Sequence, residues 1–517
     1  MKRNRVFAVG VVLGAALALG SPAGAQGSDQ RGVFDGAQDV GVVAFKGAVV
    51  HDPNTGAYRL TASGANIWGN ADAFHYAWTR RSGDLHIAAD FSWVGAGTDP
   101  HRKGGLMMRQ NLTPGSPYAD VMVHGDGMVS LQYRVVQDGP TYQIISATWH
   151  PKRIRLEREG DFVYFSVAGE DGVLRHAGGS FRIAFQQPYY VGLALSAHNN
   201  SVSETGAFSN VALTVPNLAY VPDTGYPAKV ESTLEVIDVG GIQSRRIVRQ
   251  YDGKIEAPNW SRDGKWLVYN SNGRIWRVDV EGKTEPVAIN TGPNIKNNND
   301  HGISPDGQSL AISDQSEPDN LSRIFLLPLA GADKPRALVS DPEARSYWHG
   351  WTPDGKTLAY VRVGVSNDVY DIWTVDIATG ARKPLIEGPG VDDGPEYSPD
   401  GKYVYFNSTR TGAMQIWRAN ADGSNPVRLT NDSNMRDWFP HLSPDGKWIV
   451  FVSFGLDIAV TDHPPNRSDV AIRMMPADGS APPVVLTRLF GGQGTINVPS
   501  WSPDGKSVAF VSYRLVR

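Results

Sequence analysis

Cysteine is absent from all 517 residues of the chain. A protein without disulfides must be stabilised by its hydrophobic core, and a chain of this length can bury a large one. The absence of cysteine also argues against a lipid anchor on an N-terminal cysteine and against cysteine metal motifs. We therefore expect packing alone to hold the fold together.

An excess of basic residues is also missing. The 49 lysines and arginines are outnumbered by 53 aspartates and glutamates, and no basic patch or tail stands out. Binding to nucleic acid depends on basic side chains that displace counterions from phosphates. Nucleic acid is therefore not an expected partner.

Long apolar runs are confined to the N-terminus. Lys2, Arg3 and Arg5 precede the apolar run VFAVGVVLGAALALG, and Ala23-Gly24-Ala25 forms a small-residue cleavage site. This order is typical of a secretory signal peptide, here over residues 1–25. No other stretch approaches the ~18 apolar residues of a membrane span. The sequence predicts a periplasmic or secreted protein with no membrane span after signal removal.

Several common catalytic motifs are absent as well. The sequence contains no Gly-x-Ser-x-Gly elbow, no phosphate-binding loop and no His-Glu-x-x-His. Those patterns mark the commoner hydrolase, nucleotide-binding and zinc-protease mechanisms. The motifs therefore give no support to those classes of enzyme.

A repeated unit occupies the second half of the chain. It occurs six times, as PNWSRDGKWLVYNS, HGISPDGQSLAISD, HGWTPDGKTLAYVR, PEYSPDGKYVYFNS, PHLSPDGKWIVFVS and PSWSPDGKSVAFVS. The turn aspartates are Asp263, Asp306, Asp354, Asp400, Asp445 and Asp504, separated by 43, 48, 46, 45 and 59 residues. A period near 45 residues is the length of one four-stranded propeller blade.

The chemistry of the unit fits a blade. Pro presets φ in the turn, Asp caps it with its side chain, and Gly permits the backbone that follows. Alternating apolar residues after the turn predict a half-buried strand, and two further short strands follow. The last unit stops after two strands, and STLEVIDVGG and SRRIVRQYDG, before the first unit, are predicted to complete it by closing the ring. Residues 228–517 should therefore form six blades.

The repeat of WSPDG, Lys and a hydrophobic strand resembles the WD40-like repeat of the TolB-type six-bladed β-propeller family. The resemblance covers the C-terminal half of the chain and implies that fold. It does not extend to the α/β domain that precedes the propeller in TolB itself. Such a repeat identifies a fold much more strongly than a function.

The first half of the chain, residues 30–215, lacks this unit. Its short alternating strands, such as DLHIAADFSWV and YADVMVHG, are separated by Gly, Asn, Asp and Pro turns, a pattern that predicts a β-sandwich. ANIWGNADAFHYAW, KGGLMMR and YYVGLALSAHNN followed by FSNVAL resemble concanavalin A-like (laminin-G-like) jelly rolls, which often accompany bacterial carbohydrate-active proteins. Residues 216–227 are predicted to form the linker. The expected fold class is all-β, a jelly-roll sandwich followed by a six-bladed propeller.

One aromatic cluster in the first half is a candidate saccharide site. Trp68 offers a flat ring that could cover the apolar face of a sugar, and Asp72 and His75 could supply hydrogen bonds. The alternative is that Trp68 and Trp78 fill the space between two sheets and that His75 is a core or rim histidine. The sequence leaves both interpretations open.

The inner strands of the propeller carry the second group of candidates. The first strand of each blade lies nearest the axis, so side chains just before the turns should converge near one channel mouth. His301 and His349 stand at the position that other units give to proline. The candidate substrate-binding residues near this mouth are Glu256, Asn259, Asp300, Trp348, Trp438 and Asn497.

A divalent metal is one possible occupant of the mouth, because imidazole and carboxylate suit Mn, Zn or Fe. The arrangement is similar to that of oligogalacturonate lyases, in which histidines and a glutamine hold a metal that neutralises a uronate carboxylate. The resemblance implies His301, His349, His441 and Gln493 as ligands of Mn, Zn, Fe or Ca. The alternative is that the histidines bond to backbone or water.

Asp392, Asp393 and Glu396, in DDGPEY, are candidate catalytic carboxylates. The separation of such carboxylates decides their chemistry, and a sequence does not give it. The alternative is a hydrogen-bonded strand entry with no catalytic role.

Three functions follow from these candidates. The leading hypothesis is an exported protein that binds a polysaccharide or oligosaccharide, with or without a metal. The second is a metal-dependent polysaccharide lyase or glycoside hydrolase. The third is a non-catalytic envelope scaffold with envelope proteins as partners. Clustered aromatics at the mouth favour sugar binding, a bound metal favours the enzyme, and an apolar rim favours the scaffold.

Overall fold

A computed structural model describes residues 31–97, 99–217, 229–241, 243–465 and 467–516. The expected signal peptide at residues 1–25 and residues 218–227 of the expected linker lie outside these ranges. Apart from one short 3-10 helix, η1 (Gln493–Thr495), the described elements are strands. The all-β prediction is therefore confirmed. No helix among the described residues has both the length and the apolar character needed to cross a membrane.

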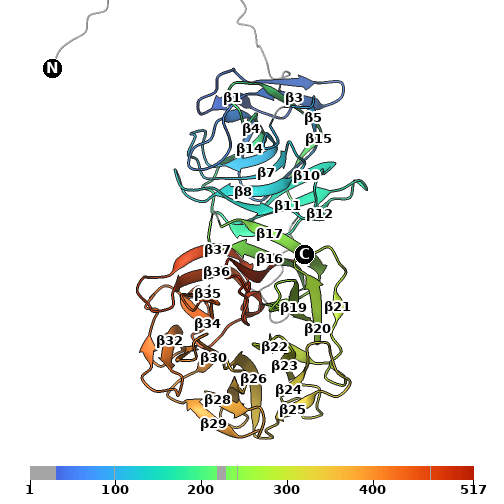
Figure 1. Cartoon of the computed structure of the whole chain (residues 1–517). Coiled ribbons are helices and arrows are strands. Elements are labelled where there is room, and N and C mark those ends of the chain that lie inside the picture. The colour runs from blue at the N-terminus through green and yellow to red at the C-terminus, as the bar shows by residue number, and fades with distance from the viewer. Residues whose placement is uncertain (1–30, 98, 218–228, 242, 466, 517) are drawn as a thin grey trace, which may run out of the picture.

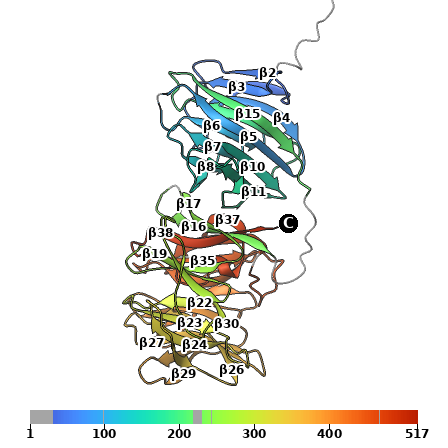
Figure 2. The ribbon, with the colours of Figure 1, turned by 90° about the vertical axis from the view of Figure 1, so that its right-hand side faces the viewer.

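Two large sheets build the N-terminal half (Figures 1 and 2). The first is ten-stranded, with the order β1 (Gly36–Val40), β4 (Phe74–Arg81), β14 (Tyr189–Ser196), β6 (Lys103–Arg109), β7 (Tyr118–His124), β8 (Val129–Arg134), β9 (Tyr142–Ile145), β17 (Arg245–Asp252), β16 (Val230–Asp238) and β38 (Ser507–Leu515). The second is eight-stranded: β12 (Arg175–His176), β11 (Phe162–Ala168), β10 (Arg153–Glu159), β5 (Leu85–Val94), β15 (Glu204–Thr214), β3 (Ala57–Ala62) and β2 (Ala48–Asp52), with β13 (Phe181–Arg182) beside β11.

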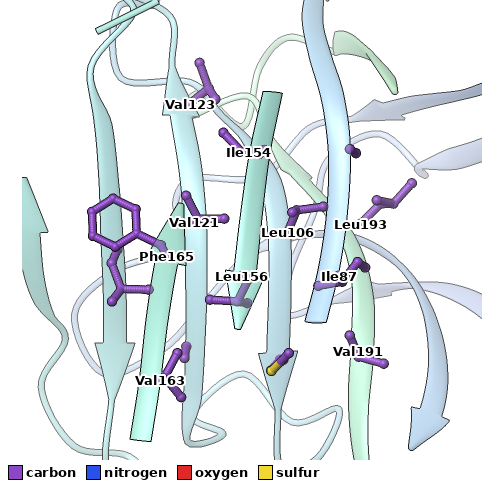
Figure 3. Packing of buried hydrophobic residues seen from close by; sticks show 14 of the residues in the cluster. Ile87, Leu106, Val121, Val123, Ile154, Leu156, Val163, Phe165, Val191 and Leu193 are labelled. Carbon is purple, nitrogen blue, oxygen red and sulfur yellow. The ribbon is translucent and has the colours of Figure 1, made fainter. Parts of the chain in front are cut away.

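The two sheets share one hydrophobic core (Figure 3). Leu106 and Val121 of the first sheet and Leu156 and Phe165 of the second are all fully buried in it. Side chains two residues apart on one strand face the same side, which is why the alternating segments of the sequence fill this space. Burial of each large side chain contributes about 1.5–3 kcal/mol.

Five four-stranded sheets surround a common axis in the C-terminal half (Figure 1). In chain order they are β18 (Glu256–Trp260), β19 (Trp266–Ser271), β20 (Arg274–Asp279) and β21 (Val287–Ala288); β22 (Asn297–Ile303), β23 (Ser309–Asp314), β24 (Arg323–Pro328) and β25 (Arg336–Val339); β26 (Ala344–Trp351), β27 (Thr357–Gly364), β28 (Tyr370–Asp376) and β29 (Arg382–Ile386); β30 (Asp392–Tyr397), β31 (Tyr403–Ser408), β32 (Gln415–Asn420) and β33 (Val427–Arg428); β34 (Arg436–Leu442), β35 (Trp448–Phe454), β36 (Arg467–Pro476) and β37 (Val484–Gly491). The propeller predicted from the repeats is present.

The SPDG turns have the geometry that the sequence predicts. In the fourth unit the Ser398 hydroxyl donates to Asp400 Oδ1 at 2.7 Å, and the Lys402 amide donates to the same oxygen at 3.1 Å. Ser398 Oγ also accepts from the Tyr403 amide at 3.0 Å. The turn side chains therefore close the hairpin between the first and second strands, as expected of Asx- and Ser-based turns.

The sixth unit differs from the other five. Strand β38 pairs with β16 from Val230↔Leu515 to Asp238↔Ser507, so the two ends of the propeller close the ring as predicted. However, β38, β16 and β17 belong to the ten-stranded sheet, because β9 of the N-terminal half pairs with the outer edge of β17. The segment before the last turn forms no strand and keeps only the bridge Trp501↔Val508. Among the described residues there are thus five separate blades, not six.

Buried ion pairs join the two halves of the structure between β38 and β10. Arg514 of β38 donates to Glu157 Oε2 at 2.7 Å and to Glu159 Oε1 at 2.6 Å, both on β10. Burial acts to raise the pKa of Glu157, but the neighbouring arginines and Ser166 outweigh it and lower that pKa to about 2. Arg245 Nη1 donates to the Ser180 carbonyl at 2.7 Å. The halves therefore pack as one structure.

Arg514→Met should destabilise the whole chain. The change leaves Glu157 and Glu159 buried without this cation, and breaking such a pair costs on the order of 3–5 kcal/mol. Urea unfolding followed by tryptophan fluorescence measures the loss. Arg175→Ala, which removes an exposed ion pair with Asp171, is the matched control and should change little. Equal effects of the two substitutions would contradict this role for Arg514.

Candidate functional site

The inner strands of neighbouring blades lie side by side, so residues far apart in the sequence meet at the axis. These strands are β18, β22, β26, β30 and β34. Each carries a register shift, for example between Trp348 and Gly350 on β26 and between Asp393 and Glu396 on β30. A β-bulge adds one residue to a strand and changes the direction in which the side chain of that residue points. His349 is the added residue of β26.

His349 stands at the centre of a buried polar group. Its Nε2 lies 3.1 Å from Asp393 Oδ1 and 3.8 Å from Asp300 Oδ1. The Asn497 amide donates to Asp300 Oδ1 at 2.7 Å. All four side chains are buried, and they come from β22, β26, β30 and the segment after η1. Ring closure is what brings Asn497 to Asp300.

The charges of this group compensate one another. Burial acts to lower the pKa of His349, but the hydrogen bond to Asp393 and the nearby carboxylates outweigh it and raise that pKa. Burial acts to raise the pKa of Asp393, and the contact with His349 reverses the shift and lowers it. Burial raises the pKa of Asp300 to about 6. His349 and Asp393 thus form an ion pair, with Asp300 poised to titrate close to neutral pH.

A histidine from the face opposite the SPDG turns also contacts this group. His463, between β35 and β36, places Nε2 4.0 Å from Asp393 Oδ2. Its ring packs against Trp438 and Phe439, and Phe439 stacks on His349 with ring centroids 5.8 Å apart. In an antiparallel meander, second-to-third connections and first-to-second turns lie at opposite ends. His463 therefore reaches this group from the face opposite the SPDG turns.

The expected metal ligands do not come together. His301 is fully buried, neither ring nitrogen has a hydrogen-bond partner, and burial lowers its pKa to about 4. His441 Nδ1 lies 2.8 Å from Glu396 Oε2. Gln493 lies in η1, and its backbone amide donates to the Pro464 carbonyl at 2.9 Å. Because of the register shifts, these side chains point in different directions and contact different partners. The alternation of residues in the sequence does not reveal such shifts.

Another group does have the geometry to hold a metal ion. Among the described residues, His86, Glu157 and Glu159 are the three whose ligand atoms lie within 4.8 Å of one another. They line a polar pocket of about 830 Å³ between the two halves, together with Arg514. Arg514 already bridges both carboxylates. A metal ion there would have to displace a guanidinium.

The candidate catalytic carboxylates are all engaged. Arg410 Nη2 lies 2.9 and 3.0 Å from the two oxygens of Asp392. Asp393 pairs with His349, and Glu396 accepts from the Leu442 amide at 3.0 Å besides facing His441. Each carboxylate therefore has a partner from a neighbouring strand or blade, which fits the hydrogen-bonded strand entry.

The other channel candidates have structural contacts. Trp348 and Trp438 are fully buried in hydrophobic clusters. Asn259 Nδ2 donates to the Pro499 carbonyl, and its Oδ1 accepts from the Ile303 amide at 3.0 Å, so it bridges neighbouring blades. Glu256 Oε1 lies 2.7 Å from Lys254 Nζ. Neither tryptophan offers a free face to a sugar.

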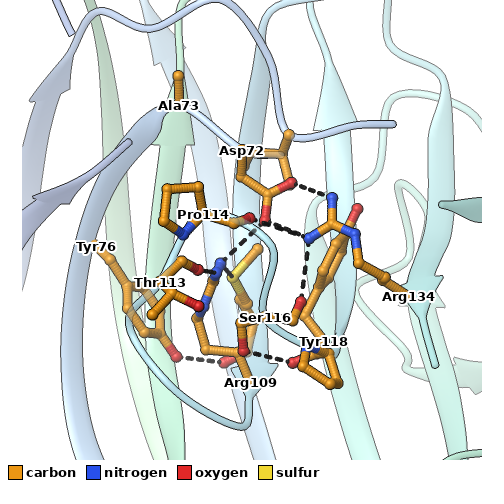
Figure 4. Close-up of polar contacts among 12 residues, drawn as sticks. Asp72, Ala73, Tyr76, Arg109, Thr113, Pro114, Ser116, Tyr118 and Arg134 are labelled. Atoms are coloured by element: carbon orange, nitrogen blue, oxygen red, sulfur yellow. Dashed lines mark hydrogen bonds and ion pairs between the residues drawn. The ribbon is translucent and has the colours of Figure 1, made fainter. Parts of the chain in front are cut away.

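The candidate saccharide residues Trp68, Asp72 and His75 each have different partners, and Figure 4 shows those of Asp72. Arg134 donates to both oxygens of Asp72, at 2.7 and 2.8 Å, and Arg109 lies 3.4 Å from one of them. His75 Nδ1 lies 2.7 Å from Asp39. Trp68 is half-buried, with Lys103 Nζ 5.0 Å from its ring centroid. Asp72 is thus the centre of a buried ion-pair cluster.

Arg410, which pairs with Asp392, was not among the candidate site residues of the sequence. It lies on the connection between β31 and β32, and such connections follow no repeated pattern. A basic residue at that place in a blade is the signal that would have indicated it.

The comparisons with known proteins define the class. The TolB beta propeller domain family matches residues 302–459. An uncharacterised protein of Agrobacterium fabrum is 47% identical over 290 residues, which are 56% of this chain and 95% of that protein. The solved structure of a putative TolB from Agrobacterium tumefaciens is 47% identical, with a TM-score of 0.52, and the match covers 56% of this chain and 99% of that one. This chain belongs to the TolB β-propeller family.

More distant matches include a curated protein and a solved structure. The Tol-Pal system protein TolB of Francisella tularensis is 26% identical over 307 residues, and the match covers 57% of this chain and 65% of that protein. This chain therefore spans less than two thirds of that relative. The structure of an oligogalacturonate lyase in complex with manganese is 15% identical, with a TM-score of 0.36 over 55% of this chain and 98% of that one. A likeness at that level transfers no function.

Asp300→Asn should remove a pH dependence of stability. The pKa of Asp300 rises from an ordinary 3.8 to about 6 on folding, so the folded state holds this proton more tightly than the unfolded chain. Its stabilising effect is complete below the unfolded pKa and is lost as pH rises through the folded pKa. The wild type should lose up to roughly 3 kcal/mol more than the variant between about pH 4 and 7. Parallel denaturation curves across this range would contradict the prediction.

Asp72→Ala should destabilise the N-terminal half. The substitution leaves the buried guanidinium groups of Arg109 and Arg134 without this carboxylate, and the expected cost is about 3–5 kcal/mol. Thermal unfolding by circular dichroism measures it. A variant of unchanged stability would return Asp72 to the list of candidate ligand-binding residues.

Proposed function

We propose that this protein is an exported envelope protein that binds a polypeptide partner on one face of its propeller, without catalysis. The observation that carries the proposal is a set of exposed apolar side chains on the face where the buried channel group lies. They are Ile295, Val365, Val369 and Leu456. A contiguous apolar patch marks an interaction site, and a partner that covers this face would contact all four side chains.

The topology places these four residues on the same face. Val365 and Val369 lie between β27 and β28, and Leu456 lies between β35 and β36. Ile295 lies between the outer strand β21 and the next inner strand β22. Second-to-third and blade-to-blade connections share the face opposite the SPDG turns. His463 and Arg410 reach the channel from that same face.

The pairing of the carboxylates supports binding rather than catalysis. A general base or nucleophile needs an accessible lone pair in reach of a substrate. Asp392, Asp393 and Glu396 are instead held by Arg410, His349 and His441. The alternative, a metal-dependent polysaccharide lyase or glycoside hydrolase, would require these contacts to open.

Saccharide binding is a second candidate, in the N-terminal half. Trp68 favours it, because its half-buried ring keeps an accessible part. Trp348 and Trp438 give it no support at the channel, since both are buried in the core.

The proposal also covers the domain boundaries and the sixth blade of the propeller. We infer that residues 30–215 form a concanavalin A-like jelly roll, that 216–227 link it to a propeller over 228–517, and that β38, β16 and β17 serve as the sixth blade. The shared core of the two sheets and the β16–β38 pairing support this division. A signal peptide at residues 1–25 would deliver the protein to the periplasm or the medium.

Binding to the Pal component of the same organism tests the proposal, because a relative is named as part of a Tol-Pal system. The purified full chain should bind purified Pal in isothermal titration calorimetry. A Leu456→Asp/Val365→Asp double variant should weaken the affinity at least roughly tenfold, since it places charges in an apolar contact. Val427→Asp, at an exposed position of the outer strand β33, is the matched control.

Two results would contradict this function. One is the absence of binding by the wild-type protein, or an affinity that the double variant leaves unchanged. The other is product release from a uronate-containing or neutral polysaccharide that Asp393→Asn abolishes, which would make the protein an enzyme.

A further inference from the structure

Three histidines of the N-terminal half lie together, away from the propeller channel. The His101 ring centroid is 6.1 Å from that of His124 and 5.6 Å from that of His198. His101 lies between β5 and β6, His124 ends β7, and His198 follows β14. Neither the propeller nor its proposed partner uses this cluster. We propose that these three imidazoles bind a zinc ion.

His124 carries the observation that points to a ligand. It is 3% exposed, and its Nδ1 has no hydrogen-bond partner. Its Nε2 lies 3.3 Å from both Ser130 Oγ and Gln132 Nε2. Gln132 Oε1 is also buried without a partner. A buried polar atom without a partner is costly, and two of them meet here.

One change gives Gln132 Oε1 a partner and leaves His124 Nδ1 free for a metal ion. If the Gln132 amide turns over, its Oε1 accepts the proton of His124 Nε2, and Ser130 lies within reach of the same pair. The proton then resides on Nε2, and the lone pair of Nδ1 is free for a metal ion. A hydrogen bond at the ring nitrogen that does not bind the metal fixes the tautomer of a metal-binding histidine.

His198 has the same arrangement. Its Nδ1 lies 3.1 Å from Asp99 Oδ2, so the carboxylate holds a proton on Nδ1 and leaves the Nε2 lone pair free. Asp99 Oδ1 accepts from the His101 amide at 2.7 Å and thereby ties the third histidine to the second. A carboxylate behind a histidine is the usual support of a zinc ligand.

His101 is the residue that closes the site. Zinc–nitrogen bonds of about 2.0–2.1 Å bring the ligand nitrogens to within about 3.4 Å of one another, closer than these ring spacings allow. The His101 side chain is exposed and can rotate towards the other two. Three neutral imidazoles with one open position suit zinc, whereas calcium and magnesium require oxygen ligands.

Arg102 and Lys103 are the nearby cations, and each is held by contacts of its own. Arg102 Nη1 donates to Glu204 at 2.6 Å, and its guanidinium stacks 4.2 Å from the Trp93 ring centroid. Lys103 Nζ donates to Asn66 and to the Ile67 carbonyl. Arg514, by contrast, sits directly on the carboxylates of the His86 group. The histidine cluster is therefore the better zinc site of the two.

Metal titration of the chelator-treated full chain tests the proposal. One Zn²⁺ per chain should bind in calorimetry, and Co²⁺ in its place should give the visible absorption of a tetrahedral site. His101→Ala and His198→Ala should each weaken Zn²⁺ binding at least roughly tenfold and abolish the Co²⁺ band. His86→Ala is the matched control and should bind as the wild type does.

Three outcomes would overturn the site: no stoichiometric metal in the wild-type protein, unchanged affinity in both trio variants, or loss of binding in His86→Ala alone. Circular dichroism confirms that each variant is folded before its affinity is compared. Both trio substitutions remove side chains with solvent exposure, so the fold should survive them.

Discussion

Pairing of β16 with β38 is the constraint on which the channel depends. The two strands lie at opposite ends of the propeller sequence, and nine consecutive residue pairs join them. Closure of the ring brings Asn497 to within 2.7 Å of Asp300 and completes the group around His349. Without that pairing the inner strands would keep their local hairpins, but the imidazole and its two carboxylates would lose a common axis. The buried charges can be tolerated only because the closed ring supplies each with a partner.

Buried acidic side chains are paired with cationic ones in several parts of the molecule. Asp72 with Arg134, Glu157 with Arg514 and Asp393 with His349 are buried pairs placed in three different parts of the structure. Such pairs contribute less to stability than apolar packing of equal volume, but they penalise any arrangement that separates them. They therefore specify which strands meet.

Most of the fold could be predicted from the sequence, whereas the site could not. Repeats, turn chemistry and alternation located the blades and the ring closure, because those signals are local and recur. The bulge at His349, the burial of Trp348 and the partner of Asp72 depend on contacts across blades or sheets, which no local pattern encodes. The sixth unit departed from expectation for the same reason, since β9 of the other half occupies the edge of β17.

The parallel pairing of β9 with β17 has a consequence for assembly. β9 belongs to the half that a ribosome would make first, and its free edge is available before the propeller exists. β17 can dock on that edge early, but β16 must wait for β38, the last strand of the ring to be made. The N-terminal half would then hold β17 in place while the propeller ring is still open between β16 and β38. Non-local strand pairings of this kind fold slowly, and a waiting edge is exposed to wrong partners.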